Sequence, residues 1–486
     1  LLLIICHLSF SPAGAQSLTV TVDSVGLLAQ QLPDSVRFTV AELKVCGPLN
    51  GADLKLLQQI ASRTKAKKAT DVLLTSLDLS EVSIVESKGA VRTKVDQLPG
   101  SFLSGSKALE RVVLPETVVG VSTSCFSGCS KLKEVTLPEG VATIGDNAFN
   151  NCSSLESIKL PAQLATIGRG AFNGCSSLRD IDIPEGVGKI DAVAFAGCKQ
   201  LERIDLKAAV GSIANGLFTG CERLEDIVLP ASVKTIGNDA FKKCSALEKV
   251  EASEPLEEIG NSAFEKCTSL QAIDLSRVRQ VGSSAFAGCT SLTDVEMDNV
   301  TRIGNGAFEG CMGLASVHIE GQLLAVGTGV FQNCSSLAYV VLPSTVKSIG
   351  TKAFKGCKSL EDISLPSSLT RINDHAFEEC SSLRTIFIPN MVKQLGSDTF
   401  ENCTSLDSVY IQGFVEKLES DVFRYCHSLR VVILPVSLKS IGDNAFEQCT
   451  LLQTVDLPIS VTSIGDGAFE RCTSLTAVAV PAACTS

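Results

Sequence analysis

The chain has 486 residues and a formal net charge of −11, with 42 Lys and Arg against 53 Asp and Glu. This acidic balance argues against a nucleic-acid-binding protein, which usually carries a basic surplus. Apolar residues make up 45% of the chain and charged residues 20%, so the chain can bury a core and global disorder is excluded. It also contains 20 Cys and 21 Phe but no Trp. The spacing of the cysteines distinguishes a disulfide scaffold from a metal site or a core position.

The first 15 residues are typical of a secretory signal peptide. The apolar run LLLIICHLSF is followed by Ala13, Gly14 and Ala15, a small-x-small cleavage pattern. Ten residues are too few to span a bilayer, which needs about 20 apolar residues, and the alternative interpretation is a buried N-terminal strand. We therefore expect an exported protein, at the cell surface or outside the cell, with no transmembrane segment. The missing initiator Met and the abrupt end at Ser486 predict that the natural sequence continues at both ends.

Residues 16–97 are expected to form an N-terminal cap built from degenerate repeats. Two stretches, 40–45 and 74–79, fit short strands with alternating apolar residues. Between them, residues 50–61 place Leu54, Leu57 and Ile60 on one face of a helix, with Asn50 or Asp53 as its N-cap. Such a cap is needed because the first coil of a repeat array must be covered.

Residues 98–486 repeat one unit of 22 or 23 residues. A Leu begins each unit, from Leu109 to Leu475, and a Phe recurs from Phe126 to Phe469. A Cys lies three residues after each of these Phe residues, from Cys129 to Cys472, so 16 of the 20 cysteines hold one repeat position. Self-similarity at this period is the signature of a solenoid.

Each unit opens with an L-x-x-I-x-L pattern, which is the strand signature of leucine-rich repeats. We predict a β-rich leucine-rich-repeat solenoid of about 16–17 coils with a parallel concave sheet. The first, fourth and sixth positions should point inward and the third and fifth outward, because side chains alternate along a strand. An I-G turn and an A-F-x-x-C segment follow. They leave too few residues for a long helix, so we expect a short helical turn or an irregular arc on the convex side.

The cysteine ladder is best interpreted as a core feature. Equivalent side chains in a stack run parallel toward the core, which disfavours disulfides although the Cα spacing would allow them. No C-x-x-C pair or neighbouring His accompanies the ladder, which disfavours zinc. We predict buried thiols that act as small apolar groups and weak donors to nearby carbonyls. No cofactor and no metal ion are expected.

The run LPxxVxxIGxxAFxxCxxLxxV resembles the BspA-like leucine-rich-repeat surface proteins of the Bacteroidales type. The match extends over about residues 98–481. The resemblance implies a secreted or cell-surface protein that binds a macromolecular partner, such as a host matrix protein or another cell surface. It supplies no fixed set of binding residues, so none is transferred.

Outward positions of the strands are the expected place for a partner. Two groups stand out there. One, the acidic row, suits a basic partner or a loosely held cation and consists of Asp182, Asp205, Glu251, Asp274 and Glu296. The other, the aromatic patch, is the predicted partner-binding site and consists of Tyr339, Val341, Phe387, Tyr410, Val431 and Ile433. The alternative is ordinary exposed strand surface, because aromatic and β-branched residues favour strands.

An enzyme is not expected, because no H-E-x-x-H, G-x-S-x-G or phosphate-binding Gly loop occurs. The main prediction is a surface protein for recognition or adhesion that binds a protein partner and no nucleic acid. Glycan binding is the first alternative, although glycan sites usually use aromatic platforms and the chain has no Trp. A structural surface component or an enzyme is a weaker alternative. The partner, the mode of anchoring and the oligomeric state are not determined by the sequence.

Overall fold

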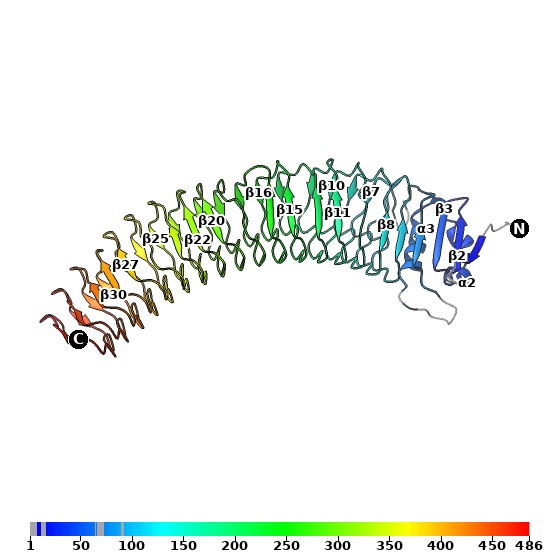
Figure 1. The fold of residues 1–486 in the computed structure, drawn as a ribbon. Coiled ribbons are helices and arrows are strands. Elements are labelled where there is room, and N and C mark those ends of the chain that lie inside the picture. Colours follow the sequence, from blue (N-terminus) through cyan, green and yellow to red (C-terminus); the bar gives the residue numbers. More distant parts are fainter. Residues whose placement is uncertain (1–6, 11–15, 64, 66–71, 89–91, 486) are drawn as a thin grey trace. The chain divides into compact units, whose positions relative to one another are not determined.

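The structure is a computed structural model that describes residues 7–10, 16–63, 65, 72–88 and 92–485 (Figure 1). The chain divides into two compact units, each described by itself. Unit 1 contains residues 1–233, 243–245 and 251–253. Unit 2 contains residues 234–242, 246–250 and 254–486. In the part of the chain that the structure describes, no helix is both long enough and apolar enough to cross a membrane.

Unit 1 begins with mixed α and β structure. Strand β1 (His7–Phe10) runs antiparallel to β2 (Gln16–Thr21), and further strands join in the order β1-β2-β3-β4-β6-β8, with β5 also paired to β3. The other elements are α1 (Leu28–Gln31), α2 (Asp34–Arg37), β3 (Glu42–Leu49), α3 (Gly51–Ala61), β4 (Ser76–Asp78), β5 (Val82–Ile84), β6 (Arg111–Val113) and β8 (Glu134–Thr136). The cap strands therefore share one sheet with the first strands of the repeats. Strand β1 lies within the expected signal peptide. Cleavage of that peptide stays a prediction.

Helix α3 confirms the helix predicted at 50–61. Its N-cap is Asn50, whose side chain accepts hydrogen bonds from the backbone N–H groups of Ala52 and Asp53. The carboxylate of Asp53 accepts one in return from the backbone N–H of Asn50, at 3.1 Å. Asp53 also accepts hydrogen bonds from the N–H groups of Gly26 and Leu28, at 2.7 and 3.1 Å. This buried carboxylate thus joins the start of the helix to the loop before α1.

Most repeats contribute a first strand at the predicted place, but the repeats that begin at Leu155, Leu270 and Leu360 do not. Those of unit 1, after β6 and β8, are β11 (Asp180–Ile183), β13 (Arg203–Leu206) and β15 (Asp226–Leu229). The residues of β17 (Lys249–Ala252) divide between the units. Those of unit 2 are β20 (Asp294–Met297), β22 (Ser316–Ile319), β24 (Tyr339–Val341), β27 (Thr385–Ile388), β29 (Ser408–Ile411), β31 (Val431–Ile433), β33 (Thr454–Val455) and β35 (Ala477–Val478).

The first strands pair in parallel, and their outward residues lie side by side. Asp182 is opposite Asp205 between β11 and β13, and Phe387 is opposite Tyr410 between β27 and β29. The burial alternates as predicted, so that β27 buries Ile386 and Ile388 and exposes Phe387. This alternation places the third and fifth repeat positions on the solvent side of the sheet.

A second strand in each repeat was not predicted. It is two residues long and directly precedes the Gly position, and it forms parallel ladders of its own. In unit 1 these strands are β7 (Gly120–Val121), β9 (Thr143–Ile144), β10 (Thr166–Ile167), β12 (Lys189–Ile190) and β14 (Ser212–Ile213). In unit 2 they are β16 (Thr235–Ile236), β18 (Glu258–Ile259), β19 (Gln280–Val281), β21 (Arg302–Ile303), β23 (Ala325–Val326), β25 (Ser348–Ile349), β26 (Arg371–Ile372), β28 (Gln394–Leu395), β30 (Lys417–Leu418), β32 (Ser440–Ile441) and β34 (Ser463–Ile464).

The segment from the Gly to the Cys of each repeat, here called the arm, is built from turns, so the predicted arc is irregular. In the described arms, the residues two before and two after the Phe have positive φ, as at Asn147 (54°) and Asn151 (57°). Backbone N–H groups of one arm donate to carbonyls of the next, for example from Phe149 to Ala171 at 2.7 Å. These bonds satisfy the backbone of the arm without a helix.

The core of each unit is a stack of identical side chains. In unit 1 the rings of Phe126 and Phe149 have centroids 5.1 Å apart and planes 6° apart, and similar stacks run through unit 2. The ladder cysteines are free and buried. Each thiol donates to the carbonyl oxygen of a residue in the preceding repeat, as from Cys152 to Phe126 at 3.1 Å. The predicted ladder of buried thiols is therefore confirmed.

Candidate functional site

The solvent side of the first strands in unit 2 carries the aromatic patch. Strands β27, β29 and β31 form one parallel sheet, and Phe387, Tyr410 and Ile433 occupy the same repeat position in these three strands. Phe387 is 55% exposed and Ile433 is 53% exposed, while Tyr410 between them is half-buried. Val431 lies opposite Ser408 and is 38% exposed. Four of the six predicted residues therefore form one contiguous apolar surface.

The rings of Phe387 and Tyr410 stack on each other. Their centroids are 4.7 Å apart and their planes differ by 8°. Parallel strands place equivalent side chains about 4.8 Å apart, so the register itself produces this stack. Two aromatic rings held in one orientation lose little conformational entropy on binding, which suits a recognition surface.

Tyr339 and Val341 lie apart from the other four. They are in β24, which ends the sheet β20-β22-β24, two repeats before β27. The intervening segment 361–366 belongs to neither sheet and carries Ser364 at the outward position. Tyr339 is 63% exposed, whereas Val341 is half-buried. The structure thus divides the predicted patch into a pair and a group of four, with a small side chain between them.

The acidic row is less uniform than the sequence suggests. In unit 1, Asp205 binds Lys207 at 2.9 Å and lies opposite Asp182, which keeps its side chain exposed. In unit 2, Asp274 accepts hydrogen bonds from the N–H and hydroxyl groups of Ser276, so its carboxylate stabilises a local turn.

The other two members of the row lie in β17 and β20. Glu251 is in β17, and Glu296 is in β20 opposite His318. Within the described residues, no three His, Cys, Asp or Glu side chains lie close enough to hold a metal ion. A role for the row in partner binding stays a prediction.

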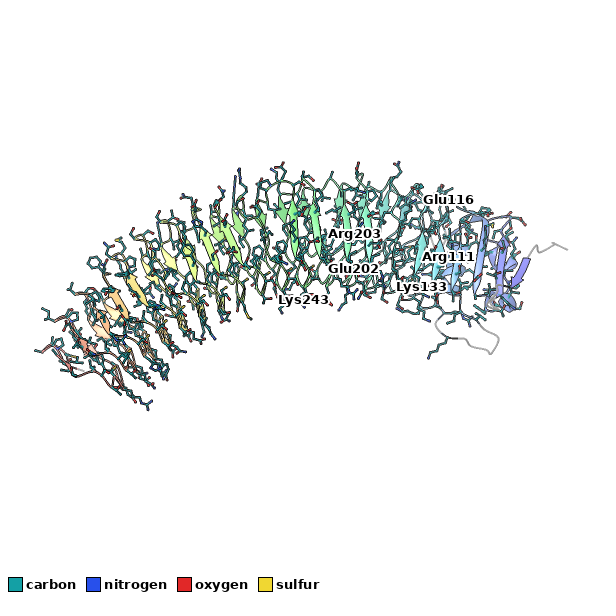
Figure 2. All side chains as sticks on the ribbon, in the orientation of Figure 1. Arg111, Glu116, Lys133, Glu202, Arg203 and Lys243 are labelled. Carbon is teal, nitrogen blue, oxygen red and sulfur yellow. The ribbon has the colours of Figure 1, made fainter. Side chains whose placement is uncertain are left out.

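Ion pairs cover much of the remaining strand face. In unit 1, Lys133 binds Glu110 at 2.8 Å and Arg111 binds Glu134 at 3.5 Å (Figure 2 labels both cations). In unit 2, Arg430 binds Asp407 at 2.7 Å. Each pair joins one repeat to the next at the same repeat position. These exposed pairs contribute little stability, but each neutralises two charges on the strand face.

A second apolar ridge in unit 2 was missed by the sequence analysis. It is formed where consecutive repeats turn from the first strand to the second, by Met391 (49% exposed), Phe414 (64%), Val436 (89%) and Ile459 (91%). Some other repeats carry polar residues at these turns, for example Ser344 and Thr345. Met391 and Phe414 also line a pocket with Lys393 and Lys417. In the sequence, the ridge could have been recognised as a run of apolar residues at the turns of consecutive repeats.

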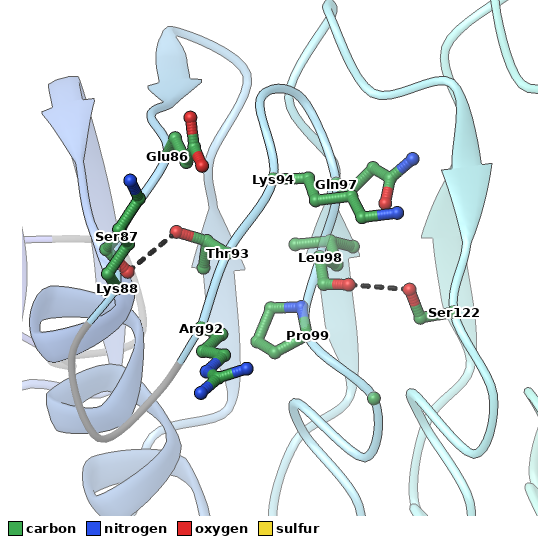
Figure 3. A pocket seen from close by; sticks show the side chains of 11 residues that line it. Glu86, Ser87, Lys88, Arg92, Thr93, Lys94, Gln97, Leu98, Pro99 and Ser122 are labelled. Carbon is green, nitrogen blue, oxygen red and sulfur yellow. Dashed lines mark hydrogen bonds between the residues drawn. The ribbon is translucent and has the colours of Figure 1, made fainter.

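A polar pocket of about 640 Å³ lies at the edge of the cap in unit 1 (Figure 3). It is lined by the exposed cations Lys88, Arg92 and Lys94 together with Glu86. A hydrogen bond of 2.9 Å between the hydroxyls of Ser87 and Thr93 holds one wall. The pocket holds no apolar surface comparable with that of unit 2.

Several carboxylates lie close together in the arms of unit 2, and the pKa of one of them, Glu401, is raised. Burial, and then the neighbouring carboxyls of Asp398 and Glu378, raise the pKa of Glu401 to about 7. Arg424 lies 3.8 Å from Glu401 but binds Glu447 more closely, at 2.7 Å. Arg424 therefore compensates Glu401 only in part.

Burial makes thiols within the ladder unsuited to nucleophilic chemistry, whereas a hydrogen bond with Cys449 lowers the pKa of Cys472 in the last repeat. Burial raises the pKa of Cys129 to about 11 and that of Cys198 to about 12, so neither forms a thiolate near neutral pH. His427, which follows a ladder cysteine, lies within hydrogen-bond distance, 3.0 Å, of the carbonyl oxygen of Gln448. His318 lies 3.3 Å from Glu320. Neither histidine is placed beside a nucleophile in these contacts.

The chain is similar to known bacterial repeat proteins. The model of the BspA type leucine-rich repeat region, with six copies, matches residues 98–225, 211–338, 325–431 and 406–486. A leucine-rich repeat protein from Bacteroides ovatus is 28% identical, with a TM-score of 0.62, and the match covers 88% of this chain and 98% of that one.

Another solved structure shares less sequence with this chain. A leucine-rich cell surface protein from Faecalibacterium prausnitzii is 20% identical with a TM-score of 0.28, covering 97% of this chain and 92% of that one. No curated protein sequence matches the chain. The repeat pattern, the parallel strand ladders and the family match together confirm the predicted solenoid. The chain belongs to the BspA-type leucine-rich repeat family.

Proposed function

We propose that this protein is a secreted or cell-surface recognition protein that binds a macromolecular partner through the strand face of unit 2. The partner class we favour is a host matrix or cell-surface protein. Solenoids of this kind present their strand surface for binding. The single observation that carries the proposal is the exposed stack of Phe387 on Tyr410, with Ile433 in register beside it.

The apolar surface is unusual for this chain, which supports a binding role. Phe387, Tyr410, Val431 and Ile433 are contiguous, whereas outward residues elsewhere include the charged Arg111, Glu134, Asp182 and Asp205. Apolar side chains exposed together mark interaction sites more reliably than single ones. Aromatic residues also carry much of the binding energy in protein interfaces.

The test is a substitution that removes the stack without touching the core. Phe387→Ser with Tyr410→Ser should weaken binding to matrix proteins by about 30-fold or more, since one aromatic anchor contributes about 2 kcal/mol. Val228→Ser is the matched control, because Val228 holds the same repeat position in unit 1 and is 56% exposed. Binding that is unchanged in the double variant and in the control contradicts the proposal.

The same assay separates protein from glycan ligands. Purified matrix proteins and polysaccharides are immobilised in parallel and probed with both variants. Loss of protein binding in the double variant alone supports the proposal, whereas binding only to polysaccharides favours the glycan alternative. Labelling of intact cells with an antibody against the repeats tests the surface location, and a signal seen only after lysis contradicts it.

We infer no catalytic role. This inference is supported by the buried, high-pKa thiols and by the absence of a nucleophile near His318 or His427 in their contacts. A polypeptide that recognises a partner through a sheet surface needs neither a cofactor nor a metal ion.

A further inference from the structure

A pocket on the strand face of unit 2 lies beside Tyr339. It has a volume of about 640 Å³ and lies between β24 and the segment 361–366 of the next repeat. Its lining includes Tyr339, Val341, Glu361, Asp362 and Ser364. The ladder of first strands is interrupted at this repeat, because 361–366 belongs to neither the sheet that ends with β24 nor the sheet that begins with β27. The pocket therefore opens where neighbouring strands do not pair.

The charged groups of the pocket are all acidic. Glu361 and Asp362 are both exposed, and the lining contains no Lys or Arg. Neither carboxylate makes an ion pair with a described residue. In some other repeats the carboxylate at the position of Glu361 pairs with a cation one repeat later, as Glu202 does with Arg223 at 3.0 Å.

An aromatic ring completes the pocket. Tyr339 is 63% exposed, which leaves its ring accessible from solvent. A guanidinium group binds to an aromatic face by a cation–π contact, and its planar fork of N–H donors matches carboxylates. Ser364 is small, so it leaves space above the segment for a long side chain.

Unit 1 contains a matched sequence with a different neighbour. Residues 224–227 read LEDI, the same as residues 360–363. The repeat before the unit 1 copy carries Arg203 at the position where unit 2 carries Tyr339 (Figure 2 labels Arg203). The Glu-Asp pair therefore comes one repeat after a cation, Arg203, in unit 1, and one repeat after the exposed ring of Tyr339 in unit 2.

We propose that this pocket takes an arginine side chain of the protein partner, with its guanidinium between the ring of Tyr339 and the carboxylates of Glu361 and Asp362. This inference rests on the proposed function and names the chemistry that the partner must present. Two strand spacings across the sheet and two residues along the strand put Tyr339 about 12 Å from Phe387. The partner surface therefore carries an arginine about 12 Å from an apolar side chain that packs on Phe387.

The pocket is tested with a defined probe. The probe is the acetylated, amidated peptide Gly-Arg-Gly-Phe-Gly, and its control carries the neutral isostere citrulline in place of arginine. Both are titrated into the full chain by isothermal calorimetry at low salt. We expect the arginine peptide to bind about tenfold more tightly than the citrulline peptide, as suits a charge-assisted contact. Equal affinities overturn the proposal.

Variants locate the binding. Glu361→Gln with Asp362→Asn, and separately Ser364→Leu, should each reduce peptide affinity about tenfold. Glu225→Gln with Asp226→Asn is the matched control and should bind as the unaltered chain does. Equal losses in both acidic double variants show a general charge effect and overturn the proposal. Circular dichroism melts confirm that each variant is folded.

The two proposals fail in distinguishable ways. If Phe387→Ser with Tyr410→Ser keeps full binding to matrix proteins while the peptide still discriminates arginine, the pocket stands and the proposed partner surface falls. If Phe387→Ser with Tyr410→Ser loses partner binding but Glu361→Gln with Asp362→Asn keeps it, the result supports the proposed partner surface and contradicts the arginine pocket.

Discussion

The thiol of Cys152 donates a hydrogen bond to the backbone carbonyl oxygen of Phe126, 3.1 Å away in the preceding repeat. The same carbonyl oxygen accepts the backbone N–H of Cys129 at 3.0 Å. One repeat position thus fills the core and holds consecutive coils together. A Ser in this position would offer a stronger donor but less apolar surface, and an Ala would leave the second lone pair unused.

The first prediction concerns the state of these thiols. We expect a thiol reagent at pH 8 to leave the ladder from Cys129 to Cys449 unmodified in the folded protein, because burial raises the pKa of Cys129 to about 11 and that of Cys198 to about 12. Cys472 is the exception, because a hydrogen bond with Cys449 lowers its pKa. After denaturation without reductant, the 16 ladder cysteines should all react. A count near zero in the denatured protein contradicts the free-thiol ladder.

The second prediction concerns Ser106, which holds the cysteine position in the repeat before Cys129. Its hydroxyl oxygen is buried and has no hydrogen-bond partner among the described residues. Burying an unpaired hydroxyl costs about 1–3 kcal/mol, so Ser106→Ala should raise the unfolding midpoint in urea. The control is Ser104→Ala, because the Ser104 hydroxyl donates to the carbonyl of Ser127 at 3.0 Å. A lower midpoint for Ser106→Ala is the contrary result.

The third prediction concerns Val193, a β-branched residue with a φ of 53°. The corresponding residues of the neighbouring repeats are Gly170 and Gly216, with φ values of 59° and 61°. A left-handed conformation costs a non-glycine residue about 1–2 kcal/mol, so Val193→Gly should raise the melting temperature. Val193→Ile keeps the strain and should not raise it. Equal melting temperatures for the two variants argue against stored strain.

The fourth prediction follows from the raised pKa of Glu401. In the folded chain this pKa is about 7, against an ordinary value of 4.5. Because the folded value is higher, the unfolded state loses its proton first, and the folded state loses stability as the pH rises from 4.5 to about 7. Glu401→Gln cannot ionise, so its advantage in melting temperature over the unaltered chain should grow between pH 5 and 8.

The control for this titration is Glu225→Gln, which changes an exposed carboxylate in unit 1. Its melting temperature should differ from that of the unaltered chain by only a small amount. An advantage for Glu401→Gln that is constant with pH shows that the cluster does not destabilise the fold when Glu401 ionises.

Much of the fold could be predicted from the sequence because the same residue types recur at the same positions from repeat to repeat. Most of the strand positions, the inward leucines and the thiol ladder were predicted from spacing. The second strand was not, because two residues such as Thr143 and Ile144 are too short to show a period. The turns of the arm need residues with positive φ. Residues of several types hold these positions, including Asn147 and Gly170, so no single residue type identifies the turns in the sequence.

The candidate site was predicted less completely for a physical reason. Repeat position fixes which way a side chain points, and this placed Phe387, Tyr410 and Ile433 together. It does not reveal where a strand ladder is interrupted, so the separation of Tyr339 from the other residues and the pocket beside it required the structure. The ridge from Met391 to Ile459 lies at turns, outside the alternation of strands on which the sequence argument depended.

The last prediction contrasts two phenylalanines of unit 2 that the composition alone does not distinguish. Phe286 is fully buried, with ring centroids 5.3 and 5.2 Å from those of its neighbours in the stack. Phe286→Ala should cost about 3–5 kcal/mol, the range for large cavities in a packed core. Phe387→Ala should cost about 1 kcal/mol or less, because only its stack on Tyr410 is lost.

Both variants are compared by urea unfolding and by partner binding. Phe286→Ala should lower the unfolding midpoint strongly, and at temperatures where it stays folded it should bind the partner normally. Phe387→Ala should do the reverse, because its ring is 55% exposed and contributes to the binding surface rather than to the core. A large loss of stability in Phe387→Ala shows that the exposed stack supports the sheet, and the binding role of the stack would then have to be argued from other residues.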